Sequence, residues 1–199
     1  MPKREEEEEP LSPMARLFQS PGMDSCIVIT IGFQAKINVE VILDDLKHNV
    51  SKHPRFSSIL SDNGAKWIKT DVDVEDHVFT PNIDLEEIGE DGESFVDDYV
   101  SRLTVIPLDR SRPLWDIHIL NVKTSDAEAV TVIRSHHALG DGVSLMSLLY
   151  DSDDSEQQID GDGERWWHDR EDGSSGLARV HFVSCLWNHE QGRRLGLKR

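Results

Sequence analysis

The residues best suited to chemistry are two adjacent histidines that precede an aspartate between glycines. His136 and His137 follow a β-branched run, and Asp141 lies between Gly140 and Gly142. An imidazole exchanges its proton near neutral pH, with a reference pKa of ~6.5, so a positioned histidine can remove a proton from a hydroxyl. The cluster therefore predicts proton-transfer chemistry with one histidine as the base.

A strand is expected to position this pair. Residues 129–135 read as a strand that leads directly to the histidines. Neighbouring side chains of a strand point to opposite faces of the sheet, so only one of His136 and His137 can enter a given site. Such residues cannot easily converge with Asp141 on one ion, so no metal is expected. The alternative is that both histidines are hydrogen-bonded packing residues.

The glycines and the aspartate predict a tight turn after the strand. Gly142 allows the backbone to turn sharply where a strand passes into a helix. Asp141 can cap that helix or pair with a buried arginine. We expect Asp141 to hold the loop rather than to transfer protons.

Hydrophobic patterning predicts a mixed α/β (α+β) fold, with a sheet flanked by helices. Strands are expected at 26–33, 56–60, 66–72, 115–122 and 129–135, and helices at 38–52, 93–105 and 143–150. Asn38 can cap the first helix, and Pro54 and Pro107 end the first two.

Changes in composition divide the chain into four parts. Residues 1–10 are expected to be a disordered acidic N-terminus, and 11–150 the folded domain. Residues 151–176 are rich in aspartate, serine and glycine, which predicts a second acidic disordered segment. Residues 177–199 are basic and predict either an amphipathic helix or a disordered tail.

Composition also excludes several classes of protein. The formal net charge of −17 and the lack of a basic stripe argue against nucleic acid as a partner. Cys26 and Cys185 lie in hydrophobic stretches without metal or disulfide spacing, which suits a reducing compartment. We expect neither a signal peptide nor a transmembrane segment, because no apolar run approaches the ~20 residues that span a bilayer.

The motif His136-His137-x-x-x-Asp141-Gly142 resembles the active-site motif of acyl-CoA-dependent acyltransferases related to chloramphenicol acetyltransferase and to peptide-synthetase condensation domains. Three stretches narrow this resemblance to the plant-type wax ester synthase/diacylglycerol acyltransferase family. They are Pro10-Leu11-Ser12-Pro13-Met14-Ala15-Arg16-Leu17-Phe18, Pro113-Leu114-Trp115-Asp116 and His137-Ala138-Leu139-Gly140-Asp141-Gly142-Val143-Ser144-Leu145-Met146. The likeness covers residues 10–150.

The resemblance implies roles for the motif. His137 would be the general base that takes the hydroxyl proton of a fatty alcohol or diacylglycerol as its oxygen attacks an acyl-CoA thioester. His136 would support the strand, while Asp141 and Gly142 would hold and turn the loop. The products would be wax esters, triacylglycerol or both, with acyl-CoA as co-substrate and no cofactor. No residues are predicted for binding acyl-CoA.

The resemblance also implies a chloramphenicol acetyltransferase-like fold of which this chain holds only the first half. Family members carry a second domain that completes a substrate tunnel, and residues 151–199 match nothing recognised in the family. An alternative is therefore a truncated, catalytically inactive fragment that binds lipid or a partner. The resemblance implies a location at the endoplasmic reticulum or plasma membrane. With no membrane span expected, peripheral membrane association and a cytoplasmic location both stay open.

Overall fold

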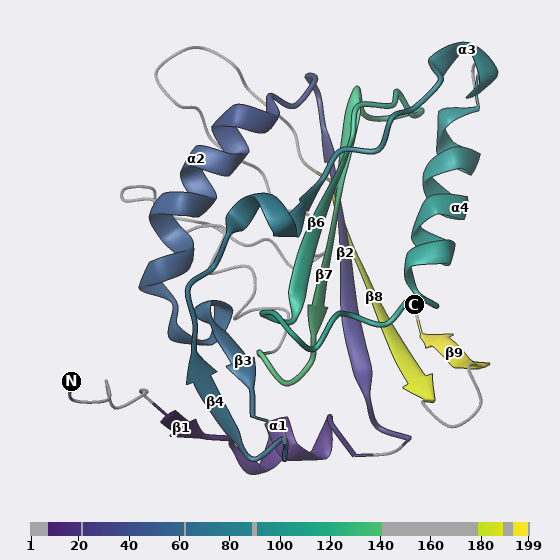
Figure 1. The fold of residues 1–199 in the computed structure, drawn as a ribbon. Helices are drawn as coiled ribbons and strands as arrows, with labels where there is room; N and C mark the ends of the chain where they lie inside the picture. The colour runs from purple at the N-terminus through teal and green to yellow at the C-terminus, as the bar shows by residue number, and fades with distance from the viewer. Residues whose placement is uncertain are drawn as a thin grey trace, which may run out of the picture.

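The computed structural model describes residues 8–20, 22–61, 63–88, 91–140, 179–188 and 193–198. The described part is a mixed α/β fold built on one large and one small sheet (Figure 1). The first strand along the chain belongs to the small sheet, and the last strand lies at the edge of the large one. This arrangement confirms the expected fold class.

The large sheet has the strand order β5-β6-β7-β2-β8-β9 within the described residues. Its strands are β5 (Val78–Phe79), β6 (Trp115–Leu120), β7 (Ala129–His136), β2 (Ser25–Phe33), β8 (Arg179–Asn188) and β9 (Arg193–Lys198). Only β5 and β6 pair in parallel, and the other neighbours are antiparallel. The expected strands at 26–33, 115–122 and 129–135 correspond to β2, β6 and β7, because β-branched runs favour strands.

Helices cover both faces of this sheet (Figure 1). On one side lies α2 (Val39–Asn49), whose Asn38 cap accepts a hydrogen bond from the Glu40 backbone N–H. On the other lies α4 (Gly92–Leu103), capped by Asp91. Both helices were expected from their apolar spacing. The first becomes a 3-10 turn, η1 (Val50–Lys52), before Pro54.

The sheet separates two hydrophobic cores. Ile29, which is fully buried, belongs to the core on the α2 side, whereas its neighbour Val28 packs in the core beneath α4. This division follows from the alternation of side chains along β2. The central strands are therefore buried on both faces, so side chains at the end of β7 are held by packing on either side.

The small sheet has the order β1-β4-β3, and α1 lies next to it. Its strands are β1 (Glu8–Pro10), β4 (Lys66–Lys69) and β3 (Ser58–Leu60), and α1 spans Pro13–Leu17. The strands expected at 56–60 and 66–72 correspond in part to β3 and β4, which pair antiparallel as a hairpin with Gly64 at a φ of 63°. Short helical turns complete the described chain: η2 (Pro54–Ser57), η3 (Val74–His77) and α3 (Leu85–Ile88).

Two expectations about the chain ends are wrong where the structure describes them. Residues 8–10, placed in a disordered N-terminus, pair with β4, and Pro10 is tolerated because β1 is an edge strand. Residues 179–188 and 193–198, expected in an amphipathic helix or disordered tail, form β8 and β9. A short apolar run fits a helix or a strand by periodicity, and here the unpaired edge of β2 selects the strand. The predicted helix at 143–150 and the acidic segment 151–176 lie outside the described residues.

Candidate active site

The paired histidines lie where β7 ends beside the start of β2. His136 is the last residue of β7 and is buried, whereas His137 is only partly buried. The backbone N–H of His137 donates to the carbonyl oxygen of Ser25 at 2.9 Å, which extends the pairing with β2 by one residue. The two imidazoles have different surroundings.

Both nitrogens of the His136 ring have partners. Nε2 lies 2.7 Å from Oδ1 of Asp24, and Nδ1 lies 3.0 Å from the backbone N of Ala138. Because a backbone N–H can only donate, Nδ1 is an acceptor, and the ring proton is on Nε2. His136 is thus held as a neutral imidazole that donates to Asp24.

Asp24 connects this ring to an arginine from a distant loop. Its second oxygen, Oδ2, accepts a hydrogen bond from Arg110 at 2.9 Å. Burial by itself raises the pKa of Asp24. The hydrogen bond from His136 and the guanidinium of Arg110 together lower it by more, so the pKa lies below its usual range. The carboxylate is therefore ionised at neutral pH.

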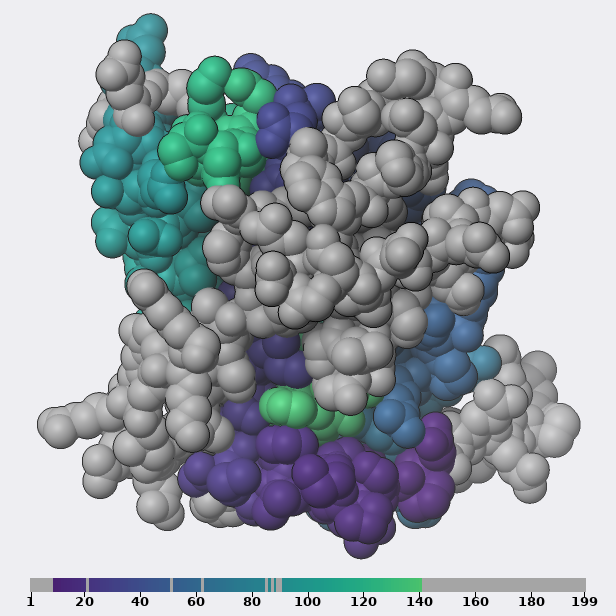
Figure 2. Space-filling view, turned by 180° about the vertical axis from the view of Figure 1, so that it is seen from behind, coloured from purple at the N-terminus to yellow at the C-terminus, as the bar shows by residue number. Residues whose placement is uncertain are grey.

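The ring of His137 stacks on an aromatic residue from the N-terminal segment. Its centroid lies 3.8 Å from that of Phe18, and the two planes differ by 9°. Nδ1 of His137 is buried and has no hydrogen-bond partner among the residues the structure describes. In the space-filling view, the purple N-terminal residues border a green surface from the end of β7 (Figure 2). The segment 10–18 thus forms one wall beside His137.

This wall presents apolar side chains to solvent. Met14 and Leu17, both on α1, are 58% and 44% exposed. The helix is fixed at its start by Ser12, which accepts a hydrogen bond from the Ala15 N–H at 3.1 Å. The region next to His137 therefore offers contact to an apolar group.

A buried ionic network lies beneath the C-terminal end of α4. The guanidinium of Arg134 bonds to both oxygens of Asp116, directly across the β6–β7 pair. Its remaining amino group donates to the carbonyl oxygens of Leu103 and Ile106, each at 2.8 Å. His118 adds a contact to Asp116 at 3.1 Å. These bonds attach α4 to the strand that carries the paired histidines.

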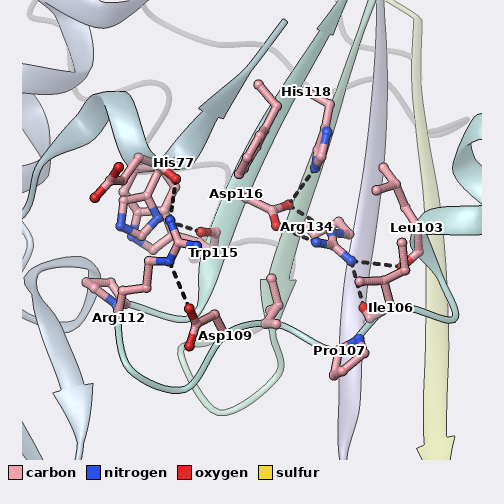
Figure 3. A pocket seen from close by; sticks show the side chains of 14 residues that line it. His77, Leu103, Ile106, Pro107, Asp109, Arg112, Trp115, Asp116, His118 and Arg134 are labelled. Carbon is pink, nitrogen blue, oxygen red and sulfur yellow. Dashed lines mark hydrogen bonds and ion pairs between the residues drawn. The ribbon is translucent and has the colours of Figure 1, made fainter. Parts of the chain in front are cut away.

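A pocket of about 270 Å³ opens beside this network (Figure 3). Arg134, Asp116 and His118 line it, together with apolar residues of the loop after α4. His77 also lines it and stacks on Trp115 with ring centroids 4.2 Å apart. His136 and His137 are not among its lining residues. The pocket is therefore separate from the paired histidines.

His77 is expected to make the free energy of unfolding depend on pH. Burial lowers the pKa of His77 below its usual value near 6.5, although its hydrogen bond to the Trp115 carbonyl oxygen opposes this. Below pH 6.5 the unfolded chain binds this proton more readily than the folded one. The contribution of neutral His77 to the free energy of unfolding is therefore fully present above pH 6.5. It is lost as the pH falls towards the lowered pKa.

The measurement is denaturant unfolding at pH 8 and pH 5.5. The variant His77→Asn, which can keep a donor to Trp115, should lose less stability between these pH values than the parent protein. Exposed His48 provides the matched control, His48→Asn. An equal loss in His77→Asn and the parent would contradict the prediction.

The predicted site residues are thus only partly described. His136 and His137 are placed at the end of β7, while Asp141 and Gly142 lie outside the described residues. The sequence interpretation did not identify Asp24, Arg110 and Phe18 as site residues, although Phe18 belongs to the quoted N-terminal motif. An acidic residue two positions before the strand expected at 26–33 was the available signal for Asp24.

Metal-binding clusters and membrane-spanning helices are both absent from the residues that the structure describes. The described ranges contain no group of three or more histidine, cysteine, aspartate or glutamate residues that could hold a metal ion. Among them, none of the helices has the length and apolar character needed to cross a bilayer.

Comparison with solved structures identifies the fold. The starter condensation domain of rhizomide synthetase matches with a TM-score of 0.53 and 16% identity, over 71% of this chain and 35% of that one. The tallysomycin biosynthesis protein TlmII matches with a TM-score of 0.54 and 15% identity, over 72% and 36%. The fold is that of chloramphenicol acetyltransferase-like condensation proteins, and the chain covers about a third of each of these two.

Sequence comparison gives the family. The model of the wax ester synthase/diacylglycerol acyltransferase catalytic domain matches residues 34–190, and the chain belongs to this family. It is 76% identical over 143 residues to wax ester synthase/diacylglycerol acyltransferase 7 of Arabidopsis thaliana, covering 72% of this chain and 30% of the relative. It is 70% identical over 155 residues to wax ester synthase/diacylglycerol acyltransferase 10 of the same plant, covering 75% of this chain and 32% of that relative. The chain thus spans about a third of the length of these relatives.

The family match extends past the boundary expected at residue 150. It continues to residue 190. Strand β8 ends at Asn188, inside the matched region. The pairing of β8 with β2 is consistent with its belonging to the domain.

Proposed function

We propose that this chain provides the general base of an acyl-CoA-dependent O-acyltransferase, and that His137 is this base. The enzyme transfers a long-chain fatty acyl group to a fatty alcohol, to diacylglycerol, or to both. The products are wax esters and triacylglycerol. The observation that carries the proposal is the partly exposed imidazole of His137 at the end of β7, in a chain of this family.

The proposed reaction uses the two nitrogens of His137 differently. Nδ1 is buried, and Nε2 takes the proton from the acceptor hydroxyl as its oxygen attacks the thioester carbonyl carbon. The carbon–sulfur bond then breaks, and the imidazolium returns the proton to the departing CoA thiolate. No acyl-enzyme forms, and acyl-CoA is a co-substrate rather than a bound cofactor.

Two features support a long-chain substrate. The exposed side chains of Met14 and Leu17 lie on the segment that stacks on His137, and they can contact an alkyl chain. The relatives are named for wax ester and diacylglycerol chemistry. In the same proposal the protein works at the endoplasmic reticulum or plasma membrane in peripheral association, while Asp141 and Gly142 hold and turn the loop after His137.

A chimera tests the proposal. The matched region of this chain replaces the corresponding region of the Arabidopsis relative with 76% identity, and the product is incubated with labelled palmitoyl-CoA and either hexadecanol or diacylglycerol. We expect labelled wax ester, triacylglycerol or both. A folded chimera that forms neither ester, beside an active parental relative, would contradict the proposal.

The 199-residue chain, assayed in parallel, examines the alternative of a non-catalytic fragment. Binding of labelled palmitoyl-CoA to the chain without turnover, together with an inactive chimera, would favour a lipid-binding role over catalysis. Turnover by the chimera would favour the enzyme.

A further inference from the structure

A chain of hydrogen bonds runs from Arg110 through Asp24 and His136 to the backbone beside His137. We propose that Asp24, held by Arg110, is a positioning residue for the base. It selects the tautomer of His136, and that tautomer holds the peptide group that follows His137. This inference rests on the proposed function, because it takes His137 as the base.

The first step is the choice of tautomer. The side chain of Asp24 is 12% exposed, and each of its oxygens accepts one bond, from His136 at 2.7 Å and from Arg110 at 2.9 Å. An ionised carboxylate only accepts hydrogen bonds, so the ring proton of His136 must be on Nε2. The guanidinium is permanently charged and favours the ionised carboxylate.

The second step passes from the His136 ring to the backbone. With its proton on Nε2, the ring presents the lone pair of Nδ1 to the backbone N–H of Ala138 at 3.0 Å. This N–H belongs to the peptide group that joins His137 to Ala138. On the other side, the N–H of His137 is held by Ser25 at 2.9 Å. The backbone of His137 is therefore fixed from both sides.

Loss of the tautomer would release one of these two attachments. With the proton on Nδ1, two N–H donors would face each other at Ala138, and the turn would have to move. A displacement of about 1 Å of a reacting group can cost about 10²-fold in rate. Asp24 therefore acts on catalysis through geometry, without touching substrate.

The first experiment observes the tautomer in the 199-residue chain by ¹⁵N NMR of its histidine rings. In Asp24→Asn, the amide can donate to Nε2 of His136, so we expect the ring proton to move to Nδ1. Asp109→Asn is the matched control, since this exposed carboxylate bonds to Ser111 and Arg112 instead. A folded Asp24→Asn protein with the proton still on Nε2 would overturn the inference.

The second experiment measures turnover in the chimera. Asp24→Asn should lower kcat by about 10²-fold with little change in KM, because positioning and not substrate binding is lost. Two replacements of His136 separate its contacts: His136→Asn places an acceptor near Nδ1, whereas His136→Gln places a donor near Nε2. We expect His136→Asn to keep the higher kcat, because the contact to Ala138 holds the base.

The outcomes distinguish this inference from the proposed function. A fully active Asp24→Asn chimera, beside an inactive His137→Ala chimera, would overturn the positioning role and leave the base in place. A fully active His137→Ala chimera would overturn the proposed function itself. Equal kcat values for His136→Asn and His136→Gln would also contradict the positioning role.

Discussion

Replacing Asp116 with alanine is expected to lower the free energy of unfolding by about 3–5 kcal/mol, because it leaves the buried charge of Arg134 without its partner. The side chains of this pair are 9% and 7% exposed, and His118 loses its contact as well. Urea unfolding of the parent and the variant measures the change. Among the described residues, Arg134 would retain the carbonyl oxygens of Leu103 and Ile106 as partners.

Two further variants identify the cause. Glu75→Ala removes one partner of the exposed Lys47–Glu75 pair and should cost far less than Asp116→Ala, because solvent screens exposed charges. The double variant Asp116→Leu/Arg134→Met should recover much of the loss, since it leaves no buried charge. A loss in Asp116→Ala as small as that in Glu75→Ala would show that the buried pair is not a major source of stability.

Replacing His137 with alanine is expected to lower the turnover of the chimera by about 10²-fold or more, which is the typical contribution of a positioned general base. The free energy of unfolding should change little, because the imidazole is partly exposed and its Nδ1 has no partner among the described residues. Turnover with palmitoyl-CoA and hexadecanol, and the thermal midpoint, are measured on the same samples.

Phe18→Leu is the matched control for a change in the wall beside this ring. It removes the aromatic stacking on His137 but leaves an apolar side chain and the base itself. Turnover of Phe18→Leu should therefore exceed that of His137→Ala. The reverse order would indicate that the aromatic wall, and not the imidazole, supports the reaction.

The central elements could be predicted from the sequence because their signals are local. The β-branched runs of β2 and β7 and the capped apolar spacing of α2 and α4 act within a few residues. Strand β8 could not be assigned in this way. Its apolar run fits a helix or a strand, and only the edge of β2, far away in the chain, decides between them.

In the candidate site, too, local motifs could be recognised in the sequence and long-range contacts could not. The motif indicated His136 and His137, because two histidines before a glycine-flanked aspartate stand out in one stretch. The bond between Asp24 and His136 joins residues 112 positions apart, and it depends on the register of β2 against β7. That register cannot be assigned from the local pattern of residues in one sequence. The Asp116–Arg134 pair could not be predicted for the same reason, since it forms only when β6 and β7 align.

Chemical rescue of the His137→Ala chimera tests the assignment of the base most directly. Imidazole added to the assay can occupy the space of the missing ring and accept the hydroxyl proton. We predict that His137→Ala has about 10²-fold lower turnover and that imidazole restores part of it, with no such gain in the parent chimera. A stable His137→Ala chimera that is as active as the parent without imidazole would contradict the assignment.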